Sequence, residues 1–115
     1  MCLRCWDFSE TSQTVSLLTR EHGLLRGLAK GAKRAHSSFS GGFDPLTSGQ
    51  IVAILKPGRD LALLTAWHLE QVHRALRHDL AANRASLFMV DLVNRMLTAY
   101  DPHPEVFDSL EAALA

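Results

Sequence analysis

Long apolar runs and a secretion signal are both missing from this sequence. None of its apolar runs approaches the roughly 18 residues that a membrane-spanning helix needs. The first residues also lack the apolar core and the small-residue cleavage site of a signal peptide. We therefore expect a cytoplasmic protein that has no membrane partner.

Cysteine is scarce, and metal-ligand patterns are missing. Cys2 and Cys5 have the spacing of half a zinc site, but zinc needs four ligands and no second pair follows. If the first eight residues form a strand, residues three apart point to opposite faces, so these thiols would not share an ion. None of the six histidines has a partner at the i, i+4 spacing of a helical zinc site. The sequence predicts structural thiols, no metal and no cofactor.

Enzyme motifs are missing as well. The sequence contains no G-x-G-x-x-G, G-x-x-x-x-G-K-[ST], H-E-x-x-H or G-x-S-x-G. Three serines lie close to His36, but a nucleophile needs a positioned base, which a flexible loop does not provide. We predict no catalytic residues and a protein that is not an enzyme.

Charge is balanced overall, with 12 basic and 12 acidic residues, but it is unevenly distributed. Residues 1–60 hold 8 basic and 5 acidic residues, whereas residues 61–115 hold 4 basic and 7 acidic ones. The basic excess is concentrated in residues 20–34, which contain three glycines and a single acid, Glu21. Such a segment can follow a phosphate backbone, and on composition alone it would equally suit a solvated charged loop.

Apolar alternation and turn residues predict five strands in the first part of the chain. Val15, Leu17 and Thr19 alternate with more polar residues, which predicts a strand with one buried face. A long loop of small residues, 32–43, follows the third strand. Five short strands with such turns suit a small antiparallel barrel. The expected strands are Leu3–Phe8, Gln13–Thr19, Leu24–Leu28, Leu46–Leu55 and Leu61–Trp67.

The composition changes after Trp67, where glycine disappears and alanine, leucine and charged residues dominate. Apolar residues at helical spacing predict an amphipathic helix from Asp79 to Leu97, with Asp79 as its N-cap. Two prolines then break the pattern, and a second helix is expected from Glu105 to Leu114. A shorter helical turn is expected from Glu70 to Arg77.

Three short motifs follow one another along the first part of the chain: DFSETS at 7–12, LLTREHG at 17–23 and LAKGAKR at 28–34. Together with the later HLEQVHRALRHDL and the long apolar helix, they resemble the N-terminal region of the bacterial RecO recombination-repair proteins, over nearly the whole chain. The resemblance implies an α+β fold: a small five-stranded antiparallel OB-type β-barrel over residues 1–68, then the beginning of an α-helical domain over residues 69–115.

RecO proteins usually run considerably further, often with a cysteine-based zinc module in the later part. The resemblance therefore implies that this chain is a fragment or a truncated reading frame. Cys2 and Cys5 do not correspond to that zinc module.

The resemblance also implies a DNA-repair mediator at the nucleoid. Such a protein binds single-stranded and double-stranded DNA, anneals complementary strands, and works with RecR and single-strand-binding protein to load RecA. Trp6, Phe39 and Phe43 are candidate platforms for unpaired bases, although Trp6 and Trp67 lie on strands and are predicted to be core. The candidate phosphate contacts are Arg20, Arg26, Lys30, Lys33, Arg34 and His36.

Two alternatives remain open. A protein-interaction module would use the basic loop against an acidic protein surface and would show little dependence on salt. An RNA-binding barrel would use the same surface, because an OB-type surface does not by itself choose the sugar. Competition between ribose and deoxyribose oligomers would separate RNA binding from DNA binding.

Overall fold

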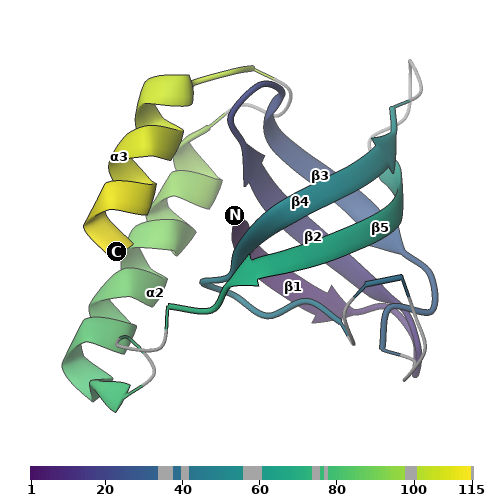
Figure 1. The fold of residues 1–115 in the computed structure, drawn as a ribbon, viewed down its shortest axis with the longest axis horizontal. Coiled ribbons are helices and arrows are strands. Elements are labelled where there is room, and N and C mark those ends of the chain that lie inside the picture. Colours follow the sequence, from purple (N-terminus) through teal and green to yellow (C-terminus); the bar gives the residue numbers. More distant parts are fainter. Residues whose placement is uncertain are drawn as a thin grey trace.

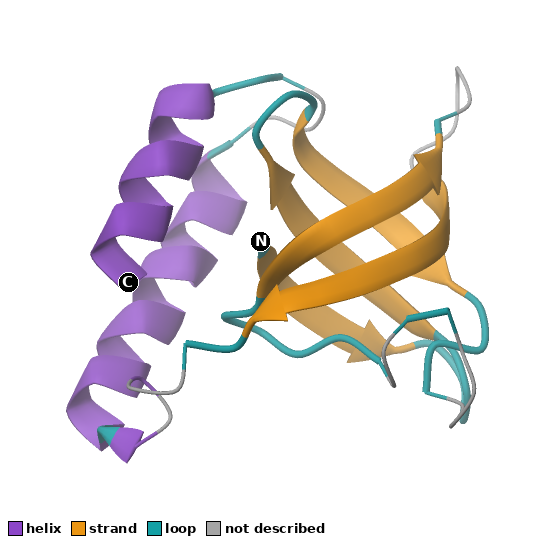
Figure 2. Cartoon of the chain, viewed as in Figure 1, coloured by secondary structure: helices purple, strands orange, loops and turns teal. Residues whose placement is uncertain are grey.

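Five strands and two helices make up the described part of the chain (Figures 1 and 2). The structure, a computed structural model, describes residues 1–33, 38–39, 42–55, 61–73, 76, 78–97 and 101–114. The elements are β1 Cys2–Asp7, β2 Gln13–Thr19, β3 Gly23–Ala29, β4 Ser48–Ile54, β5 Ala62–Gln71, α2 Leu80–Met96 and α3 Pro104–Leu114.

The strands form one curled sheet in the order β1-β2-β3-β5-β4. The predicted α+β fold, a five-stranded OB-type sheet followed by helices, is confirmed. The expectation of a wholly antiparallel barrel is wrong, because β3 and β5 run parallel where Gly27 pairs with Ala62. The sheet is also not closed by a ladder: within the described residues, a single bridge from Cys2 to Thr47 links β1 to the segment before β4.

Strand β2 buries both of its faces, whereas its alternation predicted one. Val15 and Leu17 point into the curl of the sheet. They belong to the first hydrophobic cluster, whose buried members are Cys2, Val15, Leu17, Leu25, Ala29, Ala32, Phe39, Phe43, Ala62, Leu64 and Trp67. Leu18 lies on the opposite, outer face, in the second cluster, whose buried members are Met1, Leu3, Leu18, Leu24, Leu46, Val90, Leu110 and Leu114. The outer face is buried at this end because helices pack on it, a long-range contact that the local pattern of β2 does not encode.

Helices α2 and α3 lie side by side against one end of the sheet (Figure 1). Val90 of α2 and Leu110 of α3 pack in the second cluster, between the sheet and the helices. The predicted N-cap is confirmed, since Asp79 accepts a hydrogen bond from the Ala82 amide at 3.1 Å. Among the described residues, neither helix is long and apolar enough to cross a membrane.

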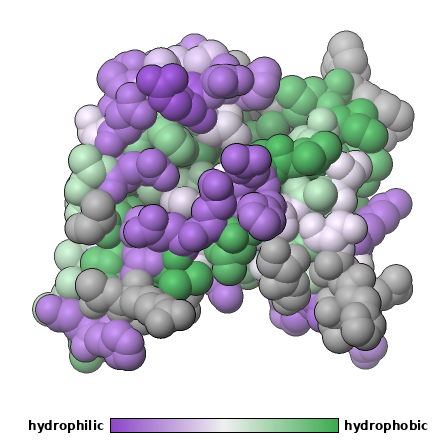
Figure 3. All heavy atoms as spheres, viewed as in Figure 1, coloured by the Kyte–Doolittle hydropathy of each residue, from purple (hydrophilic) through white to green (hydrophobic). Residues whose placement is uncertain are grey.

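Strand β5 is longer than predicted. It continues to Gln71, so the helical turn expected from Glu70 does not begin there, and much of the rest of that turn lies outside the described residues. Its neighbour β4 leaves Val52 and Ile54 exposed. Hydrophobic surface accordingly gathers near the end of β4, at the upper right of Figure 3.

Candidate nucleic-acid interface

The outer face of β1, β2 and β3 brings basic and aromatic side chains into rows. In the antiparallel register, Arg4 of β1 lies opposite Ser16 of β2, which lies opposite Arg26 of β3. The next row on the same face contains Trp6, Thr14 and Leu28. Two arginines thus lie on either side of one buried serine.

Helix α2 turns this face into a groove. The Ser16 hydroxyl donates a hydrogen bond to the Asn94 side chain of α2, and both residues are buried. Beside this contact lies a cavity of about 630 Å³, which we call the arginine groove. Its lining residues are Arg4, Trp6, Thr14, Arg26, Asn94, Arg95 and Leu97.

The groove is positive, and one carboxylate neutralises part of that charge. Asp91 on α2 lies 3.0 Å from the Nε atom of Arg95 and 4.0 Å from a terminal nitrogen of Arg4. The Arg4 guanidinium also lies 4.8 Å from the centre of the Trp6 ring, within cation–π range. Arg26 forms no ion pair within the described residues. Because these groups are largely exposed, each ion pair is weak and can exchange for a phosphate.

The basic residues predicted from the sequence fall in different places. Arg26 lines the arginine groove, and Lys30 is exposed in the turn that follows β3. Lys33 pairs with Asp7 at 3.1 Å. Arg34 and His36 lie outside the described residues. Of the predicted phosphate contacts that the structure describes, Arg26 alone lines the arginine groove.

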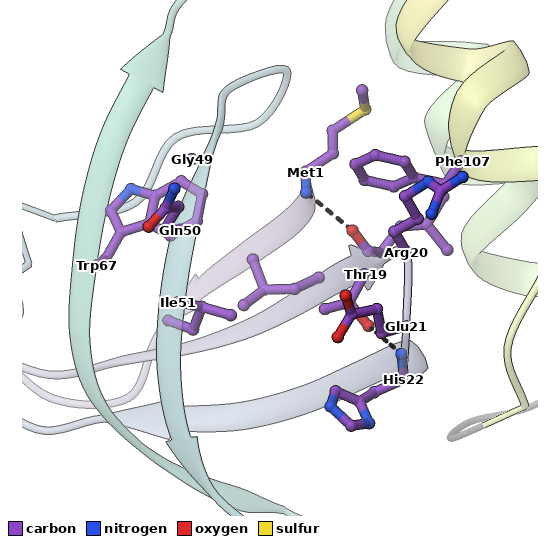
Figure 4. Close-up of a pocket in the computed structure, with 12 residues that line it drawn as sticks. Met1, Thr19, Arg20, Glu21, His22, Gly49, Gln50, Ile51, Trp67 and Phe107 are labelled. Atoms are coloured by element: carbon purple, nitrogen blue, oxygen red, sulfur yellow. Dashed lines mark hydrogen bonds between the residues drawn. The ribbon is translucent and has the colours of Figure 1, made fainter. Parts of the chain in front are cut away.

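Arg20 lies elsewhere, at the tip of the β2–β3 hairpin. Its guanidinium forms two hydrogen bonds to Asp108 of α3, at 3.1 and 3.3 Å. It lines a second pocket of about 610 Å³, in which the hairpin tip lies across from Gly49 and Gln50 of β4 (Figure 4). Arg20 thus lies outside the arginine groove and is already paired with the Asp108 carboxylate.

The aromatic residues reverse two expectations. Phe39 and Phe43 are both buried, with their ring centres 5.8 Å apart, so we leave both out of the proposed interface as stacking platforms. Gln13 helps to fix this loop, because its side chain bonds both the amide and the carbonyl of Phe43, at 2.8 and 3.3 Å. Trp67 is core, as predicted, but Trp6 is 38% exposed, so the prediction that Trp6 is core is wrong.

Arg4 and Arg95 were missed by the sequence reasoning. For Arg4 a signal existed: Arg4, Trp6 and Phe8 alternate along the first strand, which places them on one face. For Arg95 no local signal exists, since it reaches the groove only through the packing of α2 on β1.

The two cysteines lie on the same side of β1, contrary to the expectation. Leu3 is an extra residue in the pairing with β2, and this bulge turns both Cys2 and Cys5 toward the first hydrophobic cluster. A hydrogen bond between the thiols lowers the pKa of Cys5 and, with burial, raises the pKa of Cys2. In the described part of the chain, no three His, Cys, Asp or Glu side chains are grouped as metal ligands would be.

Comparison with known proteins shows to which family the chain belongs. The family described as "Recombination protein O N terminal" matches residues 1–72, which contain all five strands of the sheet. The chain belongs to the RecO family. A protein of Rhodopirellula baltica named DNA repair protein RecO is 38% identical over 112 residues, which are 97% of this chain and 42% of that protein.

Other RecO relatives match over the same extent. One from Salinibacter ruber is 40% identical over 113 residues, covering 97% of this chain and 43% of the relative. One from Bacillus pumilus is 30% identical over 112 residues, again covering 97% of this chain and 43% of the relative. The chain therefore spans less than half the length of these RecO proteins.

Proposed function

We propose that this RecO-family chain binds DNA in the arginine groove, as a non-catalytic mediator of recombinational repair. The observation that carries the proposal is the convergence of Arg4, Arg26 and Arg95, from two strands and a helix, on one cavity. Two of these arginines, Arg4 and Arg95, share the Asp91 carboxylate. Membership of a family whose members are named DNA repair proteins supports it.

The proposed mechanism is electrostatic. Each phosphate that an arginine neutralises releases counterions, which favours binding at low salt and does not depend on base sequence. A groove that screens the charge of one strand also lowers its repulsion of a second, so both single-stranded and double-stranded DNA can be held and complementary strands annealed. Under this proposal Lys30 extends the basic track beyond the groove.

The wider role follows from the family. We propose that the protein acts with RecR and single-strand-binding protein to load RecA, in the cytoplasm and near the chromosome. The barrel, residues 1–68 in our proposed division, supplies Arg4 and Arg26; the last three residues of β5, up to Gln71, fall beyond this bound. The helical part, residues 69–115, supplies Arg95, so the groove lies where the two parts meet.

The test is fluorescence anisotropy with a labelled single strand across a salt series. The variant Arg4→Gln/Arg26→Gln/Arg95→Gln is expected to give a slope of log affinity against log salt that is shallower by about 2, at about 0.7 per lost phosphate contact. A matched control, Arg20→Gln/Lys33→Gln/Arg84→Gln, removes equal charge outside the groove. Equal losses in both variants would contradict the groove, and no binding by the folded wild type would contradict the function.

One observation favours a second candidate, a protein-docking module. Helix α2 leaves Phe88 71% exposed and Met96 72% exposed, and exposed apolar surface of this kind suits a protein partner. The same salt series decides between the two, because docking through this apolar surface would depend little on salt. Competition with a ribose oligomer tests RNA as the ligand.

A further inference from the structure

Trp6 differs from Trp67, the second tryptophan of the chain. Trp6 is 38% exposed, whereas Trp67 is 3% exposed and lies in the core with Phe43. Trp6 lies on the outer sheet face next to the short side chain of Thr14, its partner across the strand pair. Its exposed part is apolar area that a ligand can bury, with a gain in free energy.

The surroundings of Trp6 suit a nucleobase. The Arg4 guanidinium lies over the Trp6 ring, 4.8 Å from the ring centre. Both of these planar groups, the guanidinium and the indole, are of a kind that stacks on bases. Arg26 and Arg95 line the same groove and can contact phosphates near a stacked base, Arg95 once the Asp91 carboxylate is displaced. The groove thus combines a stacking surface with cations.

A stacking site of this kind favours an unpaired strand. In a duplex each base already stacks between its neighbours and pairs with its partner, so a base can reach Trp6 only after it is unstacked and unpaired, which costs free energy. A single strand presents free base faces and avoids the cost of unpairing.

We propose that Trp6, with Arg4, forms a stacking site for an unpaired base, so that the arginine groove prefers single-stranded DNA to duplex. This inference rests on the proposed function, because it assigns a ligand class to the same groove. The cations supply affinity for any DNA, and Trp6 supplies the preference for the unpaired form.

The test compares Trp6→Leu and Trp6→Phe with the wild type, using oligo(dT) and a duplex. Trp6→Leu is expected to weaken oligo(dT) binding roughly 5- to 150-fold, the range for one lost base stack, with less than about twofold change for duplex. Its salt slope stays that of the wild type, since stacking releases no counterions. Trp6→Phe keeps most of the affinity because it keeps a ring.

Fluorescence gives a second readout if Trp6→Leu fails to fold. Oligo(dT) is expected to quench wild-type indole emission, and Trp6→Phe is expected to lose that quenching because Trp67 is buried. Equal losses for oligo(dT) and duplex, or no loss with either, would overturn the stacking site. If the arginine variant loses binding while Trp6→Leu does not, the inference alone fails. If the wild type binds neither DNA, the proposed function fails with it.

Discussion

Asp91→Asn is expected to strengthen DNA binding. The Asp91 carboxylate lies 3.0 Å from Arg95 and 4.0 Å from Arg4, and so occupies both cations as a bound phosphate would. DNA must displace these contacts before it can use the two arginines. Asparagine keeps the size of the side chain and removes the competing charge.

The size of the effect follows from the exposure of the three groups. The Arg4, Asp91 and Arg95 side chains are 48%, 40% and 71% exposed, so each ion pair is worth about 0.2–1 kcal/mol. The longer Arg4 contact belongs at the lower end of that range. Together they predict a gain of about 0.5–1.4 kcal/mol, or roughly 2- to 10-fold in affinity. The gain should shrink as salt rises, because salt screens exposed charges.

The assay is anisotropy with a labelled single strand, at low and at physiological salt. Asp108→Asn is the matched control, because it frees Arg20 at the hairpin tip, outside the arginine groove. If Asp91→Asn has the DNA affinity of the wild type, the Asp91 carboxylate does not compete with DNA for Arg4 and Arg95. An equal gain in Asp108→Asn would show that net charge, rather than the groove, sets the affinity.

Three further predictions concern the fold and the thiols. Leu18→Ala, in the fully buried cluster between sheet and helices, should lower the free energy of unfolding by about 2–5 kcal/mol in urea titration; a loss under about 1 kcal/mol would contradict that packing. Gly23→Ala should lower the free energy of unfolding by more than about 1 kcal/mol, because Gly23 has φ +72° and an added Cβ would overlap the Asp101 carbonyl oxygen; an unchanged melting temperature would count against this. Cys5 should react with iodoacetamide before Cys2 and at lower pH than an ordinary thiol, because its pKa is lowered while that of Cys2 is raised; peptide mapping that finds Cys2 modified first would refute this.

Local patterns predicted most of the secondary structure, because alternation and capping are local effects. The bounds of β2 agree with the prediction, and the Asp79 cap and the start of α3 near Pro104 were found from residue type alone. Arg26 alternates with the buried Leu25 along β3 and faces solvent, as a strand with one buried face requires. These elements depend on neighbours within a few residues.

Tertiary contacts account for what the sequence missed. Arg95 lines the same groove as Arg26 only because α2 packs on the sheet, so no sequence spacing connects the two residues. The glycine and serine around Phe39 suggested a surface loop. Instead, the Gln13 side chain accepts a hydrogen bond from the Phe43 amide, and the Phe39 ring is buried beside that of Phe43. The bulge at Leu3, which strict alternation does not anticipate, changed which way Cys2 points.

The most direct test of the arginine groove is backbone amide shift mapping by NMR during titration with oligo(dT). The largest shifts are expected at Arg4, Trp6, Arg26 and Arg95, and they should shrink when salt is raised. Shifts centred on the second pocket around Arg20, with the arginine groove unchanged, would show that DNA binds elsewhere.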